Sequence, residues 1–157
     1  MRRRAIAILA VTACVLIGVA LPAGASRQAE VTQGELTTFA DGTQLGYEVH
    51  GKALMIRTPS STLVLVTAGD LIPGETYGSH VHNSACGVNN AGGHYSFGHQ
   101  VSGGALDGSE IWPGPFTANP NGRVFGLAVV GEPAGPQAVS VVIHAPGGAK
   151  IACADLD

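Results

Sequence analysis

The sequence contains almost no helical periodicity beyond residue 25. Apolar residues there form short β-rich runs separated by Gly, Pro, Asn and Asp, a pattern typical of strands joined by turns. Internal repeats are absent as well. We find no serine or cysteine nucleophile motif, and no glycine-rich phosphate loop that leads from a strand into a helix. The pattern favours one all-β domain and gives no support to nucleophilic hydrolysis or nucleotide binding.

Positive charge is also scarce. The chain has 8 Lys and Arg against 11 Asp and Glu, a formal net charge of −3, and three of its arginines are Arg2, Arg3 and Arg4. Removal of the first 25 residues would take the net charge to −6. This acidic balance argues against nucleic acid or an anionic membrane surface as a partner. Any attraction of a small anion must therefore be local.

Residues 1–25 are predicted to be a cleaved signal peptide. Three arginines precede the apolar stretch 5–21, and Ala23-Gly24-Ala25 provides an Ala-x-Ala cleavage signature. We expect the mature protein to be secreted or extracytoplasmic, with no membrane attachment after cleavage. Residues 26–33 are predicted to be a flexible N-terminal segment. Residues 34–157 are long enough for one domain with its own core.

Cysteine is rare, with three residues in the whole chain. Cys14 would leave with the signal peptide, so Cys86 and Cys153 remain as an even pair in an exported protein, which predicts one disulfide. Closing that loop of about 68 residues would contribute about 4 kcal/mol in the chain-entropy model. The alternative is a Cys/His metal site, because Cys86 lies four residues after His82.

The β-rich runs predict an antiparallel Greek-key β-sandwich or flattened barrel. The expected strands are Glu35–Phe39, Gln44–His50, Ala53–Arg57, Thr62–Thr67, Thr76–His82, Arg123–Val130, Val139–His144 and Ala149–Ala152. Asp41-Gly42 and Pro146-Gly147-Gly148 are expected to be hairpin turns. The segment Asn83–Asn121 has little periodicity, and we expect it to form a long loop that covers a functional site on one face.

Histidine is concentrated around one motif. His80 and His82 alternate with Val81 and so point to the same face of a strand, about 7 Å apart. Two such imidazoles can share a first-row transition metal when other segments supply further ligands. His94 and His144 are the candidates for these, which leaves His50 and His99 outside the set. The spacing predicts a metal site.

The order of these motifs resembles that of the copper/zinc superoxide dismutases. The matching motifs are Thr76–His82, Gly92-Gly93-His94-Tyr95, Val142-Ile143-His144 and Ala149–Cys153, and the resemblance covers roughly residues 34–155. It implies that His80, His82 and His144 hold copper and that His94 is the histidine that bridges copper and zinc. It also implies that the Cys86–Cys153 disulfide ties the loop to the last strand.

Two departures from the family pattern concern zinc and substrate attraction. Only His99 and Asp107 are available for the zinc half, too few for a closed tetrahedral site, so we expect one copper and no tightly bound zinc. Copper-only relatives carry a Glu-Ile element about sixteen residues beyond the bridging histidine, and Glu110 fits that place as the partner of His94. Lys150 stands where the family has an arginine, which keeps the charge but loses the two-pronged donor geometry.

The resemblance implies an exported copper-dependent enzyme that converts superoxide to oxygen and hydrogen peroxide. In this interpretation His94 carries a proton, Glu110 orients His94, and Lys150 attracts the anion. The main alternative is an exported copper-binding or buffering protein on the same scaffold. A structural domain with a decayed site is a third interpretation. The sequence does not indicate an oligomeric state.

Overall fold

The computed structural model describes residues 28–98 and 109–157. They form eight strands and one short helix: β1 (Glu30–Thr38), α1 (Ala40–Gln44), β2 (His50–Arg57), β3 (Thr62–Gly69), β4 (Thr76–His82), β5 (Phe116–Thr117), β6 (Val124–Val130), β7 (Ser140–His144) and β8 (Lys150–Asp155). Within these ranges no helix is long and apolar enough to cross a membrane. The predicted signal peptide, His99 and Asp107 lie outside the described residues.

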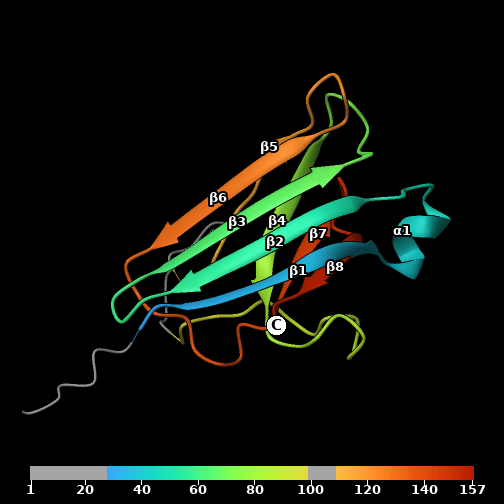
Figure 1. Cartoon of the computed structure of the whole chain (residues 1–157). Coiled ribbons are helices and arrows are strands. Elements are labelled where there is room, and N and C mark those ends of the chain that lie inside the picture. The colour runs from blue at the N-terminus through green and yellow to red at the C-terminus, as the bar shows by residue number, and fades with distance from the viewer. Residues whose placement is uncertain (1–27, 99–108) are drawn as a thin grey trace, which may run out of the picture.

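All strand pairs are antiparallel and join into one sheet of order β5-β4-β7-β8-β1-β2-β3-β6. Strand β1 pairs with β2 along its first part and with β8 at Thr37 and Thr38, so it joins two layers. In Figure 1, β1, β2, β3 and β6 run side by side, and β4 crosses behind them. The expected all-β Greek-key fold is confirmed.

The core lies between the two layers. In β3, Val64, Val66 and Ala68 are buried while Leu63, Leu65 and Thr67 face outward, the period-two alternation of a strand with one covered face. From the other layer, Tyr77 and Val81 of β4 are fully buried in the same cluster.

The two end strands approach each other closely because Gly126 has no side chain. A Cβ at Gly126 in β6 would lie 2.7 Å from the carbonyl oxygen of Pro113 and 3.0 Å from the ring of Phe116 in β5. Any larger residue would push the ends of the sheet apart. The sheet therefore curls into a nearly closed barrel.

A second, smaller apolar cluster lies on the outer side of β7 and β8, beneath the long loop. It contains Val142, Cys153 and the loop residue Ala91, all at most 1% exposed, with Phe39 and Cys86 packed against it. The described parts of the segment 83–121 are thus packed onto the sheet. The expectation that this loop covers one face is confirmed.

Seven of the eight expected strands are present, Thr76–His82 with the predicted ends and the others with shifted ends, and the turn at Pro146–Gly148 connects β7 to β8 as predicted. The strand predicted at Gln44–His50 is wrong. Tyr47 and Val49 are buried, but residues 45–49 belong to no strand, and only His50, where β2 begins, pairs with β3.

Two further expectations near the N-terminus are corrected. Asp41-Gly42 is not a hairpin turn but part of helix α1, and Gly42 packs directly against the backbone of Ile151 in β8. The segment 26–33 was expected to be flexible, yet β1 begins at Glu30, and residues 30–33 pair with β2. Cross-strand pairing with Ile56 and its neighbours explains the earlier start.

Candidate metal centre

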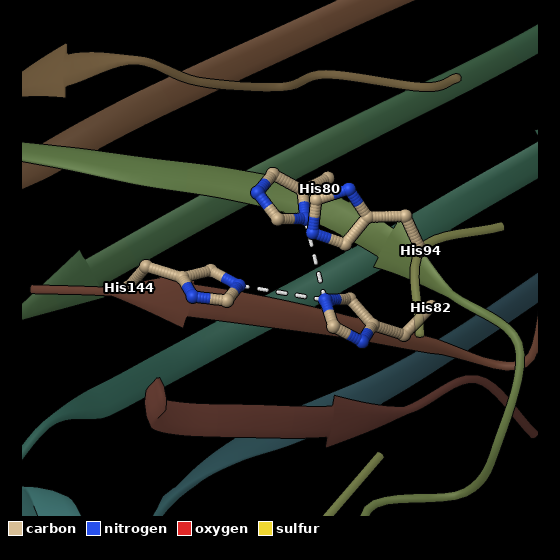
Figure 2. Close-up of side chains that lie close together, drawn as sticks. All are labelled: His80, His82, His94 and His144. Carbon is tan, nitrogen blue, oxygen red and sulfur yellow. Dashed lines mark hydrogen bonds between the residues drawn. The ribbon is translucent and has the colours of Figure 1, made fainter. Parts of the chain in front are cut away.

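Strand β4 places two histidines on its outer side. Tyr77, Ser79 and Val81 point into the core, so the alternating positions His80 and His82 face the loop, and both are buried. Their rings are stacked, with centroids 5.3 Å apart. In Figure 2 the two side chains converge on a common point with His94 and His144.

Strand β7 supplies His144, which pairs with Gly78 in the antiparallel register. Its Nδ1 donates a hydrogen bond of 2.9 Å to the carbonyl oxygen of Gly148, in the turn that follows the strand. The Nε2 atom of His144 is thereby directed at the other imidazoles and lies 3.4 Å from Nε2 of His82 (Figure 2). The ring centroids of His80 and His144 are 4.4 Å apart.

The loop brings His94 beside β4 through backbone pairing. His94 forms an isolated bridge with His82, flanked by hydrogen bonds from Asn83 N to Gly93 O and from Tyr95 N to Val81 O. This backbone pairing fixes the position of the loop residue His94 along β4, next to the strand histidines. The His94 ring centroid lies 3.6 Å from that of His80.

Glu110 fixes the orientation of His94. The Nδ1 atom of His94 donates to Oε2 of Glu110 at 2.9 Å, sixteen residues along the chain. Ser96 and Glu110 form a second isolated bridge, which holds the two segments side by side. The bond leaves Nε2 of His94 free for other chemistry.

A left-handed turn holds the loop against β8. Four consecutive residues have positive φ angles between 48° and 62°, namely Asn89, Asn90, Ala91 and Gly92. Lys150 donates from Nζ to the carbonyl oxygens of Asn90 and Gly92, each at 2.6 Å. Between these two, the Ala91 carbonyl accepts a hydrogen bond of 3.2 Å from Nδ1 of His82. The turn therefore orients His82 and binds Lys150 through successive carbonyl groups.

The four imidazoles fit a single metal ion. Their ligand atoms all lie within 4.8 Å of one another, and Nδ1 of His80 lies 3.2 Å from Nε2 of His82. Two nitrogens that each bind one metal at about 2 Å lie roughly 3 Å apart. Three of the rings have Nδ1 engaged with an oxygen, which leaves Nε2 available. Such donors suit copper and zinc alike.

Burial keeps three of these histidines neutral. Desolvation, followed by the positive charges of neighbouring groups, lowers the pKa of His80 to about 2. Desolvation and the charge of Lys150 lower the pKa of His82 to about 3. Desolvation also lowers the pKa of His144. A neutral imidazole is the form that binds a metal, so these three ligands do not need to lose protons at neutral pH.

An open cavity of about 450 Å³ leads to the cluster. His80, His94 and His144 line it together with the turn residues Pro146–Gly148. Lys150 is not among the lining residues and lies behind His82, where its ammonium group is bound by the turn. Burial lowers the pKa of Lys150.

Trp112 covers another side of the cluster. Its ring centroid is 4.3 Å from that of His80 and 5.7 Å from that of His94. The sequence contains no other tryptophan. No local sequence pattern predicts these contacts of Trp112, because they depend on how the end of the long loop that contains Trp112 packs against β4.

The structure therefore brings together the predicted residues His80, His82, His94, His144 and Glu110. The predicted disulfide between Cys86 and Cys153 is also confirmed, with a Cα–Cα distance of 5.8 Å. The alternative in which Cys86 binds metal beside His82 is wrong, because its sulfur is bonded to Cys153. Sequence reasoning missed the carbonyl groups of Ala91 and Gly148, since backbone acceptors leave no side-chain motif.

Comparison with solved structures finds that the chain is similar to the Cu/Zn superoxide dismutase from Brucella abortus. The two are 24% identical with a TM-score of 0.56, and the match covers 82% of this chain and 100% of that chain. Comparisons with protein-family models and with curated protein sequences find no match. The chain therefore has the fold of the copper/zinc superoxide dismutases.

Proposed function

We propose that this protein is an exported copper-dependent superoxide dismutase. The observation that carries the proposal is the convergence of four imidazoles from two strands and a loop beside an open cavity, on the fold shared with the Brucella enzyme. A bound copper ion supplies one-electron chemistry by cycling between Cu(II) and Cu(I). Two superoxide ions and two protons then give one oxygen and one hydrogen peroxide.

His80, His82 and His144 would hold the copper ion. Nδ1 of His80 and Nε2 of His82 and His144 are the atoms that face one another. Hydrogen bonds from the far nitrogens of His82 and His144 to backbone carbonyls fix their tautomers. The three rings come from paired strands, so their positions are rigid. Rigid imidazole donors tolerate both oxidation states of copper.

His94 would be the fourth ligand and the proton carrier. It lies in the loop, and its side chain is 36% exposed, in contrast to the buried strand histidines. Glu110 holds the proton on Nδ1, so Nε2 would be the ligand atom and, when released from the metal, would take a proton from solvent and pass it to the reduced substrate. Glu110 therefore acts as a positioning residue.

Lys150 would contribute positive charge to the site. Its ammonium group is anchored by two carbonyl oxygens, which fixes the charge in place behind His82. From there it attracts a small anion through space rather than by direct contact from the cavity wall. This local field counters the acidic balance of the chain.

Pulse radiolysis of the copper-loaded protein tests the proposal. We expect superoxide decay to accelerate in proportion to the concentration of bound copper, and replacement of His80 by Ala to abolish the effect. Bound copper is measured independently by the fluorescence of Trp112. Because the Trp112 ring lies beside His80, copper held by His80 would quench this fluorescence. A protein that binds copper at one equivalent yet leaves superoxide decay unchanged would be a copper-binding protein, the alternative function.

Zinc content tests the copper-only interpretation. We expect the copper-loaded protein to retain no zinc after dialysis against a mild chelator, because His99 and Asp107 do not complete a second, tetrahedral set. Elemental analysis of wild type and of a His99→Ala variant provides the measurement. Stoichiometric zinc that is lost in His99→Ala would show that His99 is a ligand.

A further inference from the structure

The backbone of β4 holds Trp112 beside His80. Two hydrogen bonds join the segment around Trp112 to this strand. They run from Val81 N to Ile111 O at 3.0 Å and from Gly114 N to Ser79 O at 3.2 Å. The two bonds enclose Trp112 on one segment and His80 on the other, and the ring centroids of these two residues are 4.3 Å apart. Backbone pairing therefore fixes this ring contact.

The Trp112 ring contacts two of the four candidate ligands. Besides His80 it meets His94 edge to face, with the ring centroids 5.7 Å apart. These two imidazoles are themselves close, with centroids 3.6 Å apart (Figure 2). Trp112 is not among the residues that line the open cavity. The indole thus lies beside the metal centre but off the path by which small molecules enter it.

Hydrogen bonding does not explain why an indole occupies this position. The Nε1 atom of Trp112 is buried and has no hydrogen-bond partner within the described structure. Buried polar groups are nearly always paired, so an aromatic side chain without an N–H would cost less here. The property that remains is the electron-rich ring of tryptophan, whose face is the most negative among the aromatic side chains.

Other oxidisable side chains of the described structure are kept away from the metal centre. Met55 is fully buried in the core between the two layers. The cysteines Cys86 and Cys153 are joined in the disulfide, so neither offers a thiolate. Tyr95 follows His94 but is only 7% exposed, and its hydroxyl accepts a backbone hydrogen bond. Trp112, the only tryptophan of the chain, is thus the oxidisable side chain in contact with the candidate ligands.

We propose that Trp112 is the residue that hydrogen peroxide oxidises when copper is bound, and that this reaction spares His80. The inference rests on the copper binding of the proposed function, whose product is hydrogen peroxide. The O–O bond breaks, one oxygen atom enters a ring C–H bond as a hydroxyl group, and the other leaves as water. Peroxide gains two electrons and the indole loses two, and copper is unchanged overall.

Peptide mapping by mass spectrometry tests the site of oxidation. The Cu(I)-loaded protein is treated with hydrogen peroxide without oxygen, digested and mapped. We expect the peptide that contains Trp112 to gain one oxygen atom. Its fluorescence should be lost permanently, whereas a chelator reverses the quenching that copper alone causes. Oxygen on the peptide that contains His80, with Trp112 intact, would overturn the proposal.

The zinc-loaded protein is the matched control for the metal. Zinc binds the same type of imidazole donor but has no redox chemistry, so Trp112 should stay unmodified when peroxide is added. Equal oxidation of Trp112 in the zinc-loaded and copper-loaded proteins would show that peroxide reaches the ring from solvent. That result would overturn the role of the bound copper.

Trp112→Phe tests the protection of His80. Phenylalanine retains an aromatic ring beside His80 but is harder to oxidise. We expect oxygen on the peptide that contains His80, and loss of copper by elemental analysis, at a lower dose of peroxide than in the wild type. The matched control is Tyr95→Phe, which removes the neighbouring phenol and should behave as the wild type. Unchanged oxidation of His80 in Trp112→Phe would overturn the protective role.

Elemental analysis before peroxide is added verifies that each variant binds one equivalent of copper. If Trp112→Phe fails this control, Trp112→Leu replaces it, and the wild-type map still decides the site of oxidation. Because peroxide is added directly, the result does not depend on turnover. Oxidation of Trp112 in a protein that leaves superoxide decay unchanged would support this inference and contradict only the proposed function. An active dismutase whose Trp112 survives peroxide would overturn only this inference.

Discussion

One hydrogen bond, from Nδ1 of His94 to Oε2 of Glu110, decides which nitrogen of His94 faces the other histidines. Replacing Glu110 by Ala should lower copper affinity by about 10- to 100-fold, because the ring loses its fixed tautomer and orientation. Glu110→Gln retains an acceptor oxygen and should recover most of the affinity. Competition against a copper chelator measures both constants.

The control for Glu110 is Glu48→Ala, which removes an exposed carboxylate from the segment between α1 and β2. Copper affinity should not change in this variant. Equal losses in Glu48→Ala and Glu110→Ala would show that net charge, and not the hydrogen bond to His94, determines affinity.

Lys150 combines a charge with two hydrogen bonds to the left-handed turn. Lys150→Met should slow superoxide removal and flatten its dependence on ionic strength, because the local positive charge is lost. Lys150→Arg keeps the charge and should restore the salt dependence. Initial rates measured by pulse radiolysis at several salt concentrations test this. An unchanged salt dependence in Lys150→Met would place the attracting charge elsewhere.

At the scale of elements, the disulfide holds the loop that carries His94 against β8. Replacing both Cys86 and Cys153 by Ala should lower the free energy of unfolding by about 4 kcal/mol, since the cross-link closes a long loop with a sequence separation of 67. Guanidinium denaturation of the oxidised wild type and the double variant gives the difference. A loss below about 1 kcal/mol would contradict the expectation.

Strands could be predicted from runs of apolar residues, but the sequence did not show whether a run finds a partner strand. The continuous apolar run within Thr62–Thr67 predicted β3, although only one of its two faces is buried. Tyr47 and Val49 are also buried, but residues 45–49 form no hydrogen-bonded ladder with a neighbouring strand. Burial pattern and hydrogen-bonded pairing are separate properties, and the sequence of one segment contains only the first.

The whole molecule should lose stability in acid through its buried histidines. In the folded copper-free protein, the pKa values of His80 and His82 lie at about 2 and about 3, below the value of about 6.5 in the unfolded chain. Their stabilisation is complete above about pH 6.5. It falls by up to about 1.4 kcal/mol per pH unit for each histidine as the unfolded chain takes up protons.

Guanidinium denaturation of the copper-free protein between about pH 7 and about pH 5 measures this slope. Carboxylates also contribute to the loss of stability in acid. The wild type is therefore compared with His80→Ala, which lacks one of the histidines with a lowered pKa. The slope, expressed as protons taken up on unfolding, should become smaller by an amount that rises to about one proton near pH 5. An identical slope in both proteins would show that His80 is not held neutral in the folded state.

The identity of the candidate ligands was predictable because imidazole side chains are few and fall in a recognisable order. Their environment was not. The carbonyl that orients His82 belongs to Ala91, and it is aimed by a left-handed turn that Lys150 binds from β8. Contacts of this kind arise from the closure of the loop onto a distant strand, and no local pattern encodes them.

The four histidines come from three separate parts of the chain: β4, the loop after it and β7. An unfolded chain holds only His80 and His82 close together, so a high-affinity pocket exists only after β7 has paired with β4. Under the proposed function, metal acquisition must therefore follow folding. A chain translocated in the unfolded state would leave its compartment of synthesis without metal, and the copper supply where it folds would determine how much of it becomes loaded.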